Sequence, residues 1–216
     1  MAPLFACVLL LLSLLPKEVQ SIKHNETVTS NSTNGNGYFM YFAYASNLLK
    51  ERLRLNSPSA VFNSTGKLKG YALKFGLWGD LMNNETVWQG GVATVEEQKD
   101  SEVWGVIWKI NSEDRRNLDK QEGVDRGLYR PLEVNVNTTY GEIPCHLYRM
   151  NNFTSKVPSP QYKQVLCMGA EQNGLPLDYV KKLCTLETNN SNSTSMLHKI
   201  FPAKHREKIP SHVGQP

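Results

Sequence analysis

Residues 38–49 join a run of aromatic and small side chains to a helix-like pattern that begins near Ser46. The run has no charge and no Pro, which favours a buried strand, and Ser46 or Asn47 precedes a Leu-rich segment as a helix cap would. Backbone N–H groups at a helix start lack intrahelical partners and lie at the positive end of the helix dipole. Such a junction can hold a carboxylate or a developing oxyanion. The alternative is an ordinary turn with Asn47 as its cap.

Glu122 is the second candidate for chemistry, because a carboxylate with a raised pKa can act as a general base or acid. It stands in the sequence Gln121-Glu122-Gly123-Val124, at the expected end of a helix that opens at residues 111–114. Gly commonly ends helices, and a Glu beside it usually points to water. These residues alone therefore do not assign Glu122 a catalytic role.

Residues 41–48, Tyr-Phe-Ala-Tyr-Ala-Ser-Asn-Leu, resemble the Tyr-Gly-Ser-Asn-Leu substrate loop of the gamma-glutamylcyclotransferases. Ala45 stands where the family motif has Gly. Further matches follow in the family's order and extend the resemblance over residues 38–186; they lie at 56–60, 90–94, 103–109, 118–124, 145–150, 158–163 and 167–179. So many ordered matches are more specific than any single motif. The resemblance implies an α+β fold, a mixed β-sheet or barrel of about five to seven strands flanked by helices.

The resemblance also implies a reaction. A γ-glutamyl amino acid or related γ-glutamylamine would be converted to 5-oxoproline and a free amine, because its own α-amine attacks its γ-carbonyl. Glu122 matches the family's catalytic carboxylate and would take a proton from the amine and return it to the leaving nitrogen. Tyr129 matches a tyrosine near the substrate. No metal or cofactor is implied.

The matched loop would hold the substrate's oxygens through its backbone N–H groups. Its residues are Tyr44, Ala45, Ser46, Asn47 and Leu48.

Two other functions stay open beside this enzyme. One is a catalytically impaired secreted relative that binds γ-glutamyl ligands. If the family's Gly has a positive φ, Ala45 costs about 1 kcal/mol of strain and its methyl would intrude on the substrate; with an ordinary φ the change is tolerable. The other is a glycoprotein interaction module that uses the fold as a scaffold. Fold alone cannot separate these three functions, since function resides in the site.

The elements that would carry these residues alternate between strands and short helices. Strands are expected at residues 67–75, 90–95 and 102–110, and a hairpin at 129–137 and 142–150. Helices are expected at 111–122, 159–172 and 177–186. The polar segment 76–89 would, by the resemblance, help to roof the pocket.

Residues 1–21 are expected to be a cleaved signal peptide. Residues 3–15 form an apolar run too short to span a bilayer comfortably, and residues 19–21 place small side chains where a signal peptidase cleaves. The alternative is an uncleaved anchor. After cleavage we expect no stable membrane insertion and a secreted, extracellular protein.

The segments on either side of the expected domain, residues 38–187, are polar. We expect a disordered glycosylated arm at 22–37 and a disordered basic tail at 188–216. Eight Asn-X-Ser/Thr sequons support passage through the secretory pathway. They begin at Asn25, Asn31, Asn63, Asn84, Asn137, Asn152, Asn189 and Asn192.

Composition limits the other classes of function. A net charge of +4 is too mild to indicate nucleic-acid binding. No Walker loop, dinucleotide fingerprint or zinc-type Cys/His spacing occurs. By the resemblance Cys145 and Cys167 are expected to be buried free thiols, and Cys184 is then the candidate for intermolecular pairing. We leave open whether the chain forms a homodimer.

Overall fold

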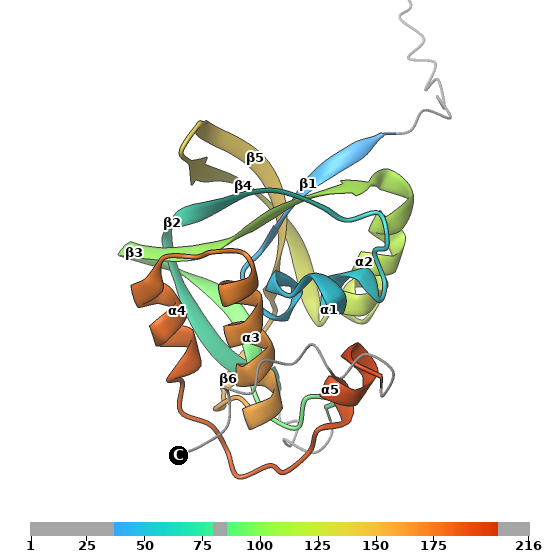
Figure 1. The fold of residues 1–216 in the computed structure, drawn as a ribbon, viewed down its shortest axis with the longest axis vertical. Coiled ribbons are helices and arrows are strands. Elements are labelled where there is room, and N and C mark those ends of the chain that lie inside the picture. The colour runs from blue at the N-terminus through green and yellow to red at the C-terminus, as the bar shows by residue number, and fades with distance from the viewer. Residues whose placement is uncertain (1–36, 80–85, 203–216) are drawn as a thin grey trace, which may run out of the picture. The chain divides into compact units, whose positions relative to one another are not determined.

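The architecture is a closed β-barrel flanked by helices, seen in a computed structural model that describes residues 37–79 and 86–202 (Figure 1). Its strands are β1 (Tyr38–Ala43), β2 (Val61–Trp78), β3 (Val92–Asn111), β4 (Tyr129–Thr138), β5 (Gly141–Met150) and β6 (Phe153–Ser155). The sheet order is β3-β1-β5-β4-β2-β6, and an additional β3–β2 pairing closes the barrel, with β6 outside it. Only the β1–β5 pair is parallel. The predicted α+β fold is confirmed.

β1 is a central strand of the barrel. It pairs with β3 on one side and with β5 on the other, which explains why its sequence carries apolar side chains on both faces. Phe42 and Ala43 at its end are fully buried. The predicted buried strand is therefore confirmed, and it delivers the chain directly to the predicted substrate loop.

β3 is longer than the sequence indicated. The strands predicted at 90–95 and 102–110 are one strand: Glu96 and Glu97 continue the pairing with β2, and residues 98–101 form an unpaired bulge before the pairing resumes at Glu102. A register shift between Lys69 and Tyr71, beside Gly70 with φ of 77°, accommodates the extra twist. The hairpin predicted at 129–150 is confirmed as β4 and β5. β6, which extends the sheet at the end of β2, was not predicted.

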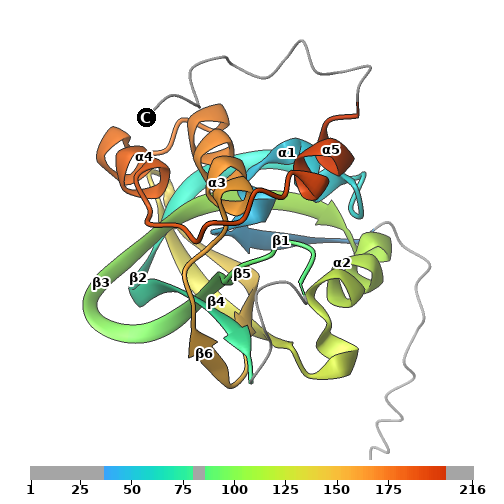
Figure 2. The same ribbon diagram turned by 90° about the horizontal axis from the view of Figure 1, so that it is seen from below.

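The helices lie mainly on one side of the barrel. They are the 3₁₀ turns η1 (Ser46–Leu48), η3 (Ser112–Asp114) and η4 (Val124–Arg126) and the α-helices α1 (Lys50–Arg54), α2 (Arg115–Glu122), α3 (Pro160–Gln172), α4 (Leu177–Cys184) and α5 (Ser195–Ile200). Figure 2 shows α1, α3, α4 and α5 together above the barrel, with α2 to one side. Ser159 caps α3 by accepting a hydrogen bond from the Tyr162 backbone, and Pro160 follows at the first helical position.

The prediction of a disordered tail from residue 188 is wrong for residues 188–202. Met196, Ile200 and Phe201 are buried, and the Met196 N–H donates to the Gln161 side chain (3.1 Å). The composition of this segment is polar, but three apolar side chains spaced for one helical face are enough to seat α5 on the domain. Residues 203–216, the arm at 22–36 and the segment 1–21 lie outside the described residues.

Cys167 and Cys184 form a disulfide between α3 and α4. The predictions of a free thiol at Cys167 and of intermolecular pairing by Cys184 are therefore wrong. The two helices form an antiparallel pair that brings the Cα atoms of these cysteines to 4.9 Å, a proximity that sequence separation does not reveal. Cys145 is the buried free thiol that was expected.

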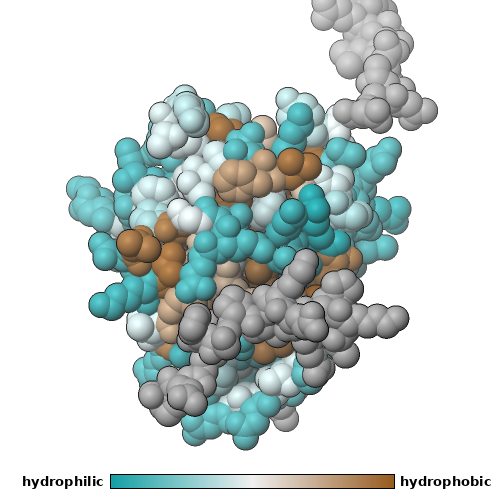
Figure 3. Space-filling model, in the orientation of Figure 1, coloured by the Kyte–Doolittle hydropathy of each residue, from teal (hydrophilic) through white to brown (hydrophobic). Residues whose placement is uncertain are grey.

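The described part of the face drawn in Figure 3 is mainly hydrophilic. On the face drawn in Figure 3, apolar side chains gather in several separate groups among charged and polar ones. Such scattered groups are normal for a protein surface. Within the described ranges, no helix is long and apolar enough to cross a membrane.

Candidate functional site

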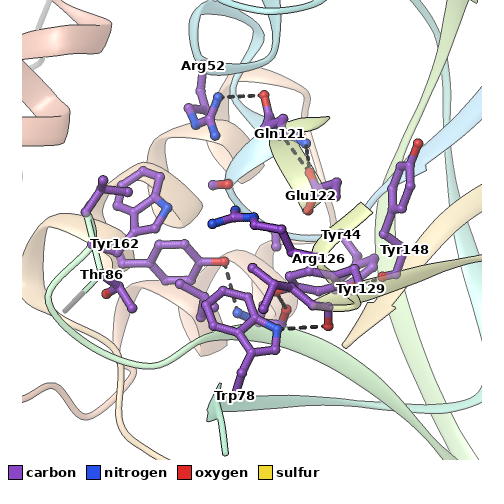
Figure 4. Close-up of a pocket in the computed structure, with 18 of the residues that line it drawn as sticks. Tyr44, Arg52, Trp78, Thr86, Gln121, Glu122, Arg126, Tyr129, Tyr148 and Tyr162 are labelled. Carbon is purple, nitrogen blue, oxygen red and sulfur yellow. Dashed lines mark hydrogen bonds between the residues drawn. The ribbon is translucent and has the colours of Figure 1, made fainter. Parts of the chain in front are cut away.

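A cavity of about 330 Å³ opens between the β1–η1 loop, the end of α2 and the N-terminal end of α3. That volume is near the lower end of small-molecule sites, about 300 to 1,000 Å³. Figure 4 shows its polar residues converging on one space from several elements. The lining residues used below are Tyr41, Tyr44, Ala45, Ser46, Asn47, Arg52, Trp78, Trp88, Ala93, Gln121, Glu122, Arg126, Leu128, Tyr129, Tyr148 and Tyr162.

Among the residues that the structure describes, Glu122 is the only carboxylate that lines this cavity. Its Oε1 accepts hydrogen bonds from Gln121 Nε2 (2.9 Å) and from Asn47 Nδ2 (3.1 Å). The same Gln121 nitrogen also donates to Asn47 Oδ1 at 3.1 Å, and Asn47 Nδ2 donates to the Tyr41 hydroxyl at 2.9 Å. The predicted loop and the predicted carboxylate, 75 residues apart, are thus joined directly.

The pKa of Glu122 is raised because burial penalises its charged form. The hydrogen bonds from Gln121 and Asn47 and the positive charge of Arg52 act in the opposite direction and lower it. Because burial outweighs these effects, the Glu122 carboxylate is more basic than one in water, and the same hydrogen bonds hold it in place. Such a group can take up and release a proton at the same site.

Arg52 is a charged side chain that is only 8 % exposed. Its Nη1 donates to Gln121 Oε1 (2.9 Å), which also accepts from Asn56 Nδ2 (2.8 Å). The guanidinium lies 5.9 Å from the centre of the Trp88 ring. Burial lowers the pKa of Arg52, and the nearby Glu122 raises it. Arg52 therefore orients Gln121, and through Gln121 it orients Glu122.

The predicted substrate loop is shaped by its packing rather than by a side-chain cap. Neither Ser46 nor Asn47 caps η1 or α1 through its side chain, so the predicted cap is wrong. Instead α3 supports the loop: a Cβ at Gly169 would lie 2.5 Å from the Leu49 backbone nitrogen, and Asn173 Nδ2 donates to the Leu48 carbonyl (2.8 Å). Leu48 is fully buried and does not line the cavity.

Ala45 has φ of −135° and ψ of −136°. Its φ is negative, so the residue lies outside the left-handed region where Gly would be favoured. The strain that a positive φ would impose on Ala45 is therefore absent. Ala45, Ser46 and Asn47 all line the cavity, as does Tyr44, whose hydroxyl donates to the Tyr148 carbonyl (2.5 Å).

Tyr129 lies in the wall of the cavity, at the start of β4. Its hydroxyl donates to the Ala93 carbonyl (2.8 Å), and its ring meets Trp78 edge to face at 5.6 Å. The Ala93 N–H in turn donates to the Tyr162 hydroxyl (3.0 Å). Burial raises the pKa of Tyr129 well above its usual range, so this phenol stays protonated. Its proton is committed to Ala93, which leaves an oxygen lone pair to meet a ligand.

Several lining residues were not anticipated from the sequence. Arg52 follows Leu48 by four positions and Leu49 by three, so helical spacing places it on their buried face. That placement was a usable signal, because a charge among core positions is unusual. Arg126 carried no such signal, whereas Trp78 and Trp88 lie in the segment 76–89 that the resemblance placed over the pocket.

The described sequon residues differ in exposure. Asn63, Asn152 and Asn192 are exposed, whereas Asn137 and Asn189 are partly buried. Asn189 Nδ2 donates to the Gln89 carbonyl (2.8 Å). Asn25, Asn31 and Asn84 lie outside the described residues.

Among the described residues, one group of His, Cys, Asp and Glu side chains is close enough to hold a metal ion: Cys167, Glu171 and Cys184. Both sulfurs of this group are joined in the disulfide, and none of the three residues lines the cavity. The thiolates that would bind a metal are thus consumed.

Comparisons with known proteins agree on one family. The AIG2-like family model matches residues 102–183. A bovine gamma-glutamylcyclotransferase is 52% identical over 153 residues, which cover 70% of this chain and 80% of the relative. The human gamma-glutamylcyclotransferase is 48% identical with the same coverage. A solved structure of a gamma-glutamyl cyclotransferase aligns with a TM-score of 0.72 and 44% identity, covering 76% of this chain and 98% of that one.

Proposed function

The chain belongs to the gamma-glutamylcyclotransferase family, and we propose that it converts γ-glutamyl amino acids into 5-oxoproline and a free amino acid. One observation carries the proposal. Glu122, a carboxylate that lines the cavity, is held by Asn47 of the substrate loop. The residues that the family resemblance singles out for chemistry and for substrate binding are therefore parts of one site.

The reaction is intramolecular. The α-amine nitrogen of the substrate forms a bond to its own γ-carbonyl carbon, and the bond from that carbon to the leaving nitrogen breaks. Because the nucleophile is tethered, a bound conformation that brings the two atoms together replaces a bimolecular encounter, which contributes as much as about 7 to 11 kcal/mol in favourable systems. The cavity's task is to fold the substrate, deprotonate the amine and protonate the leaving group.

Glu122 performs the two proton transfers. At neutral pH the substrate amine is an ammonium and has no lone pair for attack, so Glu122 accepts one of its protons. That proton and the second one, which the attacking nitrogen loses as the lactam forms, both pass to the leaving nitrogen; it departs as an ammonium, and the carboxylate is regenerated. A pKa raised by burial suits both steps, since the group must gain and lose the same proton within one turnover.

The start of η1 stabilises the developing negative charge. The N–H groups of Ser46 and Asn47 precede the first intrahelical donor, which is the Leu48 N–H bonded to the Ala45 carbonyl (2.8 Å). Both residues line the cavity, so these N–H groups are available to the γ-carbonyl oxygen as it becomes an oxyanion. Tyr129 offers its hydroxyl lone pair to a donor of the substrate.

The test is release of 5-oxoproline from γ-glutamyl dipeptides by the purified protein and by Glu122→Gln. The amide oxygen of Gln can accept the bonds from Gln121 and Asn47, so we expect a folded variant whose kcat falls at least about 100-fold. Glu113→Gln, which changes an exposed glutamate on η3, is the matched control. Equal turnover by the wild type and Glu122→Gln would refute the role of Glu122, and no turnover by either would refute the activity.

The alternative of an impaired, ligand-binding relative loses one of its two supports. A positive φ at Ala45 would have strained the loop, and the observed φ is negative, whereas Ala45 still lines the cavity. Saturable binding of a γ-glutamyl dipeptide by the wild type without turnover would restore this alternative.

We propose further that the protein passes through the secretory pathway. The support is the signal-like segment at residues 1–21, the sequons, of which Asn63, Asn152 and Asn192 are exposed, and the Cys167–Cys184 disulfide. Disulfides persist in oxidising compartments and are rare in reducing ones.

A further inference from the structure

Arg126 is a second cation in the cavity, and the proposed mechanism does not use it. It lines the cavity, and Figure 4 shows its side chain extending into that space from the end of η4. The ion pairs among the described residues involve other groups: Lys67 with Glu102, His146 with Glu133, and Arg149 with Glu96 and Glu97. Arg126 thus has no carboxylate partner in the described part of the chain.

The segment that carries Arg126 is held from both sides. Gly123 and Gly127 flank it with φ of 65° and 68°, a backbone conformation that other residues adopt only with strain. The Arg126 N–H donates to the Gly123 carbonyl (3.1 Å). After the turn, the Leu128 carbonyl accepts from Trp78 Nε1 (2.8 Å) and from the Asn151 N–H (2.9 Å). These contacts fix the backbone of the turn from which the Arg126 side chain extends.

The guanidinium folds back towards the end of α2. A Cβ built on Gly123 would lie 3.0 Å from Arg126 Nη2, so the charged group covers the residue that follows Glu122. It nevertheless forms no ion pair with Glu122. Within the described ranges the cavity is thus lined by one anion and two cations, Glu122 with Arg52 and Arg126, and the two cations enter from different elements.

A γ-glutamyl α-amino acid carries the complementary set of charges at neutral pH: one ammonium and two carboxylates. We propose that Arg126 binds the α-carboxylate of the amino acid that leaves, so that the enzyme selects γ-glutamyl amino acids over γ-glutamyl amides and simple γ-glutamylamines. The inference rests on the proposed function and names the leaving-group specificity of the same site. A guanidinium suits this task because its planar donors match a carboxylate in two parallel hydrogen bonds.

Arg126 acts by binding and not by chemistry. The leaving carboxylate keeps its charge throughout the reaction, so the pair contributes equally to the ground state and the transition state. Loss of such an interaction raises KM and leaves kcat nearly unchanged. Because Arg126 is exposed to solvent, we expect an effect of about tenfold rather than the larger effect of a fully buried pair.

The experiment compares two substrates that differ only at this carboxylate, γ-L-glutamyl-L-alanine and γ-L-glutamyl-L-alaninamide. 5-Oxoproline release is measured for the wild type, Arg126→Gln, Arg126→Lys and Arg116→Gln. Arg116→Gln removes an exposed charge from α2, away from the cavity, and is the matched control. We expect the wild type to prefer the dipeptide by about tenfold in kcat/KM.

Arg126→Gln is expected to lose this preference through a higher KM for the dipeptide, with turnover of the amide unchanged. Arg126→Lys should keep part of the preference, since it retains the charge without the fork, and Arg116→Gln all of it. Turnover of both substrates with the same preference in the wild type and Arg126→Gln would overturn the role of Arg126 alone. Absence of turnover of either substrate by the wild type would overturn the proposed function and this inference with it.

Discussion

At the scale of single residues, the site depends on how Glu122 is charged. Burial makes its carboxylate more basic, and Arg52 and two amide donors limit that effect. The base form is the ionised carboxylate, which is lost as pH falls through the pKa. A raised pKa therefore places the acid limb of the kcat/KM profile at a higher pH than an exposed glutamate would give.

This balance predicts the behaviour of Arg52 variants. Arg52→Met removes a positive charge that lowers the pKa of Glu122, so the pKa should rise further and the acid limb should move to higher pH. Arg52→Lys keeps the charge and should show a smaller movement. The measurement is the pH profile of 5-oxoproline release, with Arg116→Met as the control for loss of a surface charge. An acid limb that stays in place in Arg52→Met would contradict this account of Glu122.

The residues of the site were predictable to different degrees. Glu122 and the loop at residues 44–48 were found because they stand in contiguous motifs that resemble a family. Arg52 and Arg126 were not found, because each is a single cation outside any motif. Where its side chain points depends on how a short helix or turn packs on the domain. Tyr129 was placed correctly in the wall of the cavity, but its bond to Ala93 depends on the approach of β3, which the sequence does not specify.

At the scale of elements, the substrate loop is positioned by α3. The loop descends from β1, turns through η1 and lies against Gly169, where the absence of a side chain permits backbone contact. The bond from Asn173 to the Leu48 carbonyl holds the same segment from the end of α3. The loop's geometry is thus a property of helix packing, which explains why no cap residue was needed.

Gly169→Ala tests this seating. The added methyl would meet the backbone of Leu48 and Leu49, which cannot move without displacing Ser46 and Asn47. We expect a loss of about 1 to 3 kcal/mol in the free energy of unfolding. Catalysis should fall as well, because a displacement of about 1 Å at a reacting centre can cost 100-fold. Lys163→Ala on the same helix is the control. The free energy of unfolding is measured by denaturant unfolding, and kcat/KM is measured at a temperature where both variants are folded.

A Gly169→Ala protein with wild-type stability and turnover would show that packing on α3 does not determine the position of the substrate loop.

The secondary-structure elements themselves were largely predictable, because the strands and helices with strong periodicity were found. The exceptions have physical causes. The charged middle of β3 resembles a turn, but it is a bulge at residues 98–101 between two paired stretches of one strand. The helix α5 is short and lies in a polar segment, and its burial arises from packing on the domain, where the Met196 N–H donates to Gln161.

At the scale of the whole described domain, the C-terminal segment stabilises the roof of the cavity. Asn189 Nδ2 and the Ser191 hydroxyl donate to the carbonyl and side-chain oxygens of Gln89 (2.8 and 3.0 Å). Trp88 directly precedes Gln89, and its ring packs edge to face on the Tyr162 ring with 4.8 Å between the ring centres. Neither this contact nor the disulfide could be predicted from sequence, because both depend on where the chain returns after α3.

If the protein is secreted, this arrangement distinguishes the sequons that can carry a glycan from the one at Asn189, which cannot. A glycan attached to Asn189 Nδ2 would have to occupy the space beside Gln89 and Gly90, since a Cβ on Gly90 would already lie 2.9 Å from that nitrogen. We therefore expect the active secreted protein to carry glycans at Asn63, Asn152 and Asn192, where the side chains are exposed, and none at Asn189.

Peptide mass mapping of protein from the medium of secretory cells tests this prediction. Non-reducing digestion of the same sample should give one peptide pair joined through Cys167 and Cys184 and a free thiol at Cys145. Asn189→Gln serves as the matched variant: it removes the sequon and should leave the glycan mass unchanged, whereas Asn152→Gln should reduce it by one glycan. Retention of the chain in the cell without glycans would contradict the secretory route, and a glycan on Asn189 of active protein would contradict the role of that side chain in holding the roof.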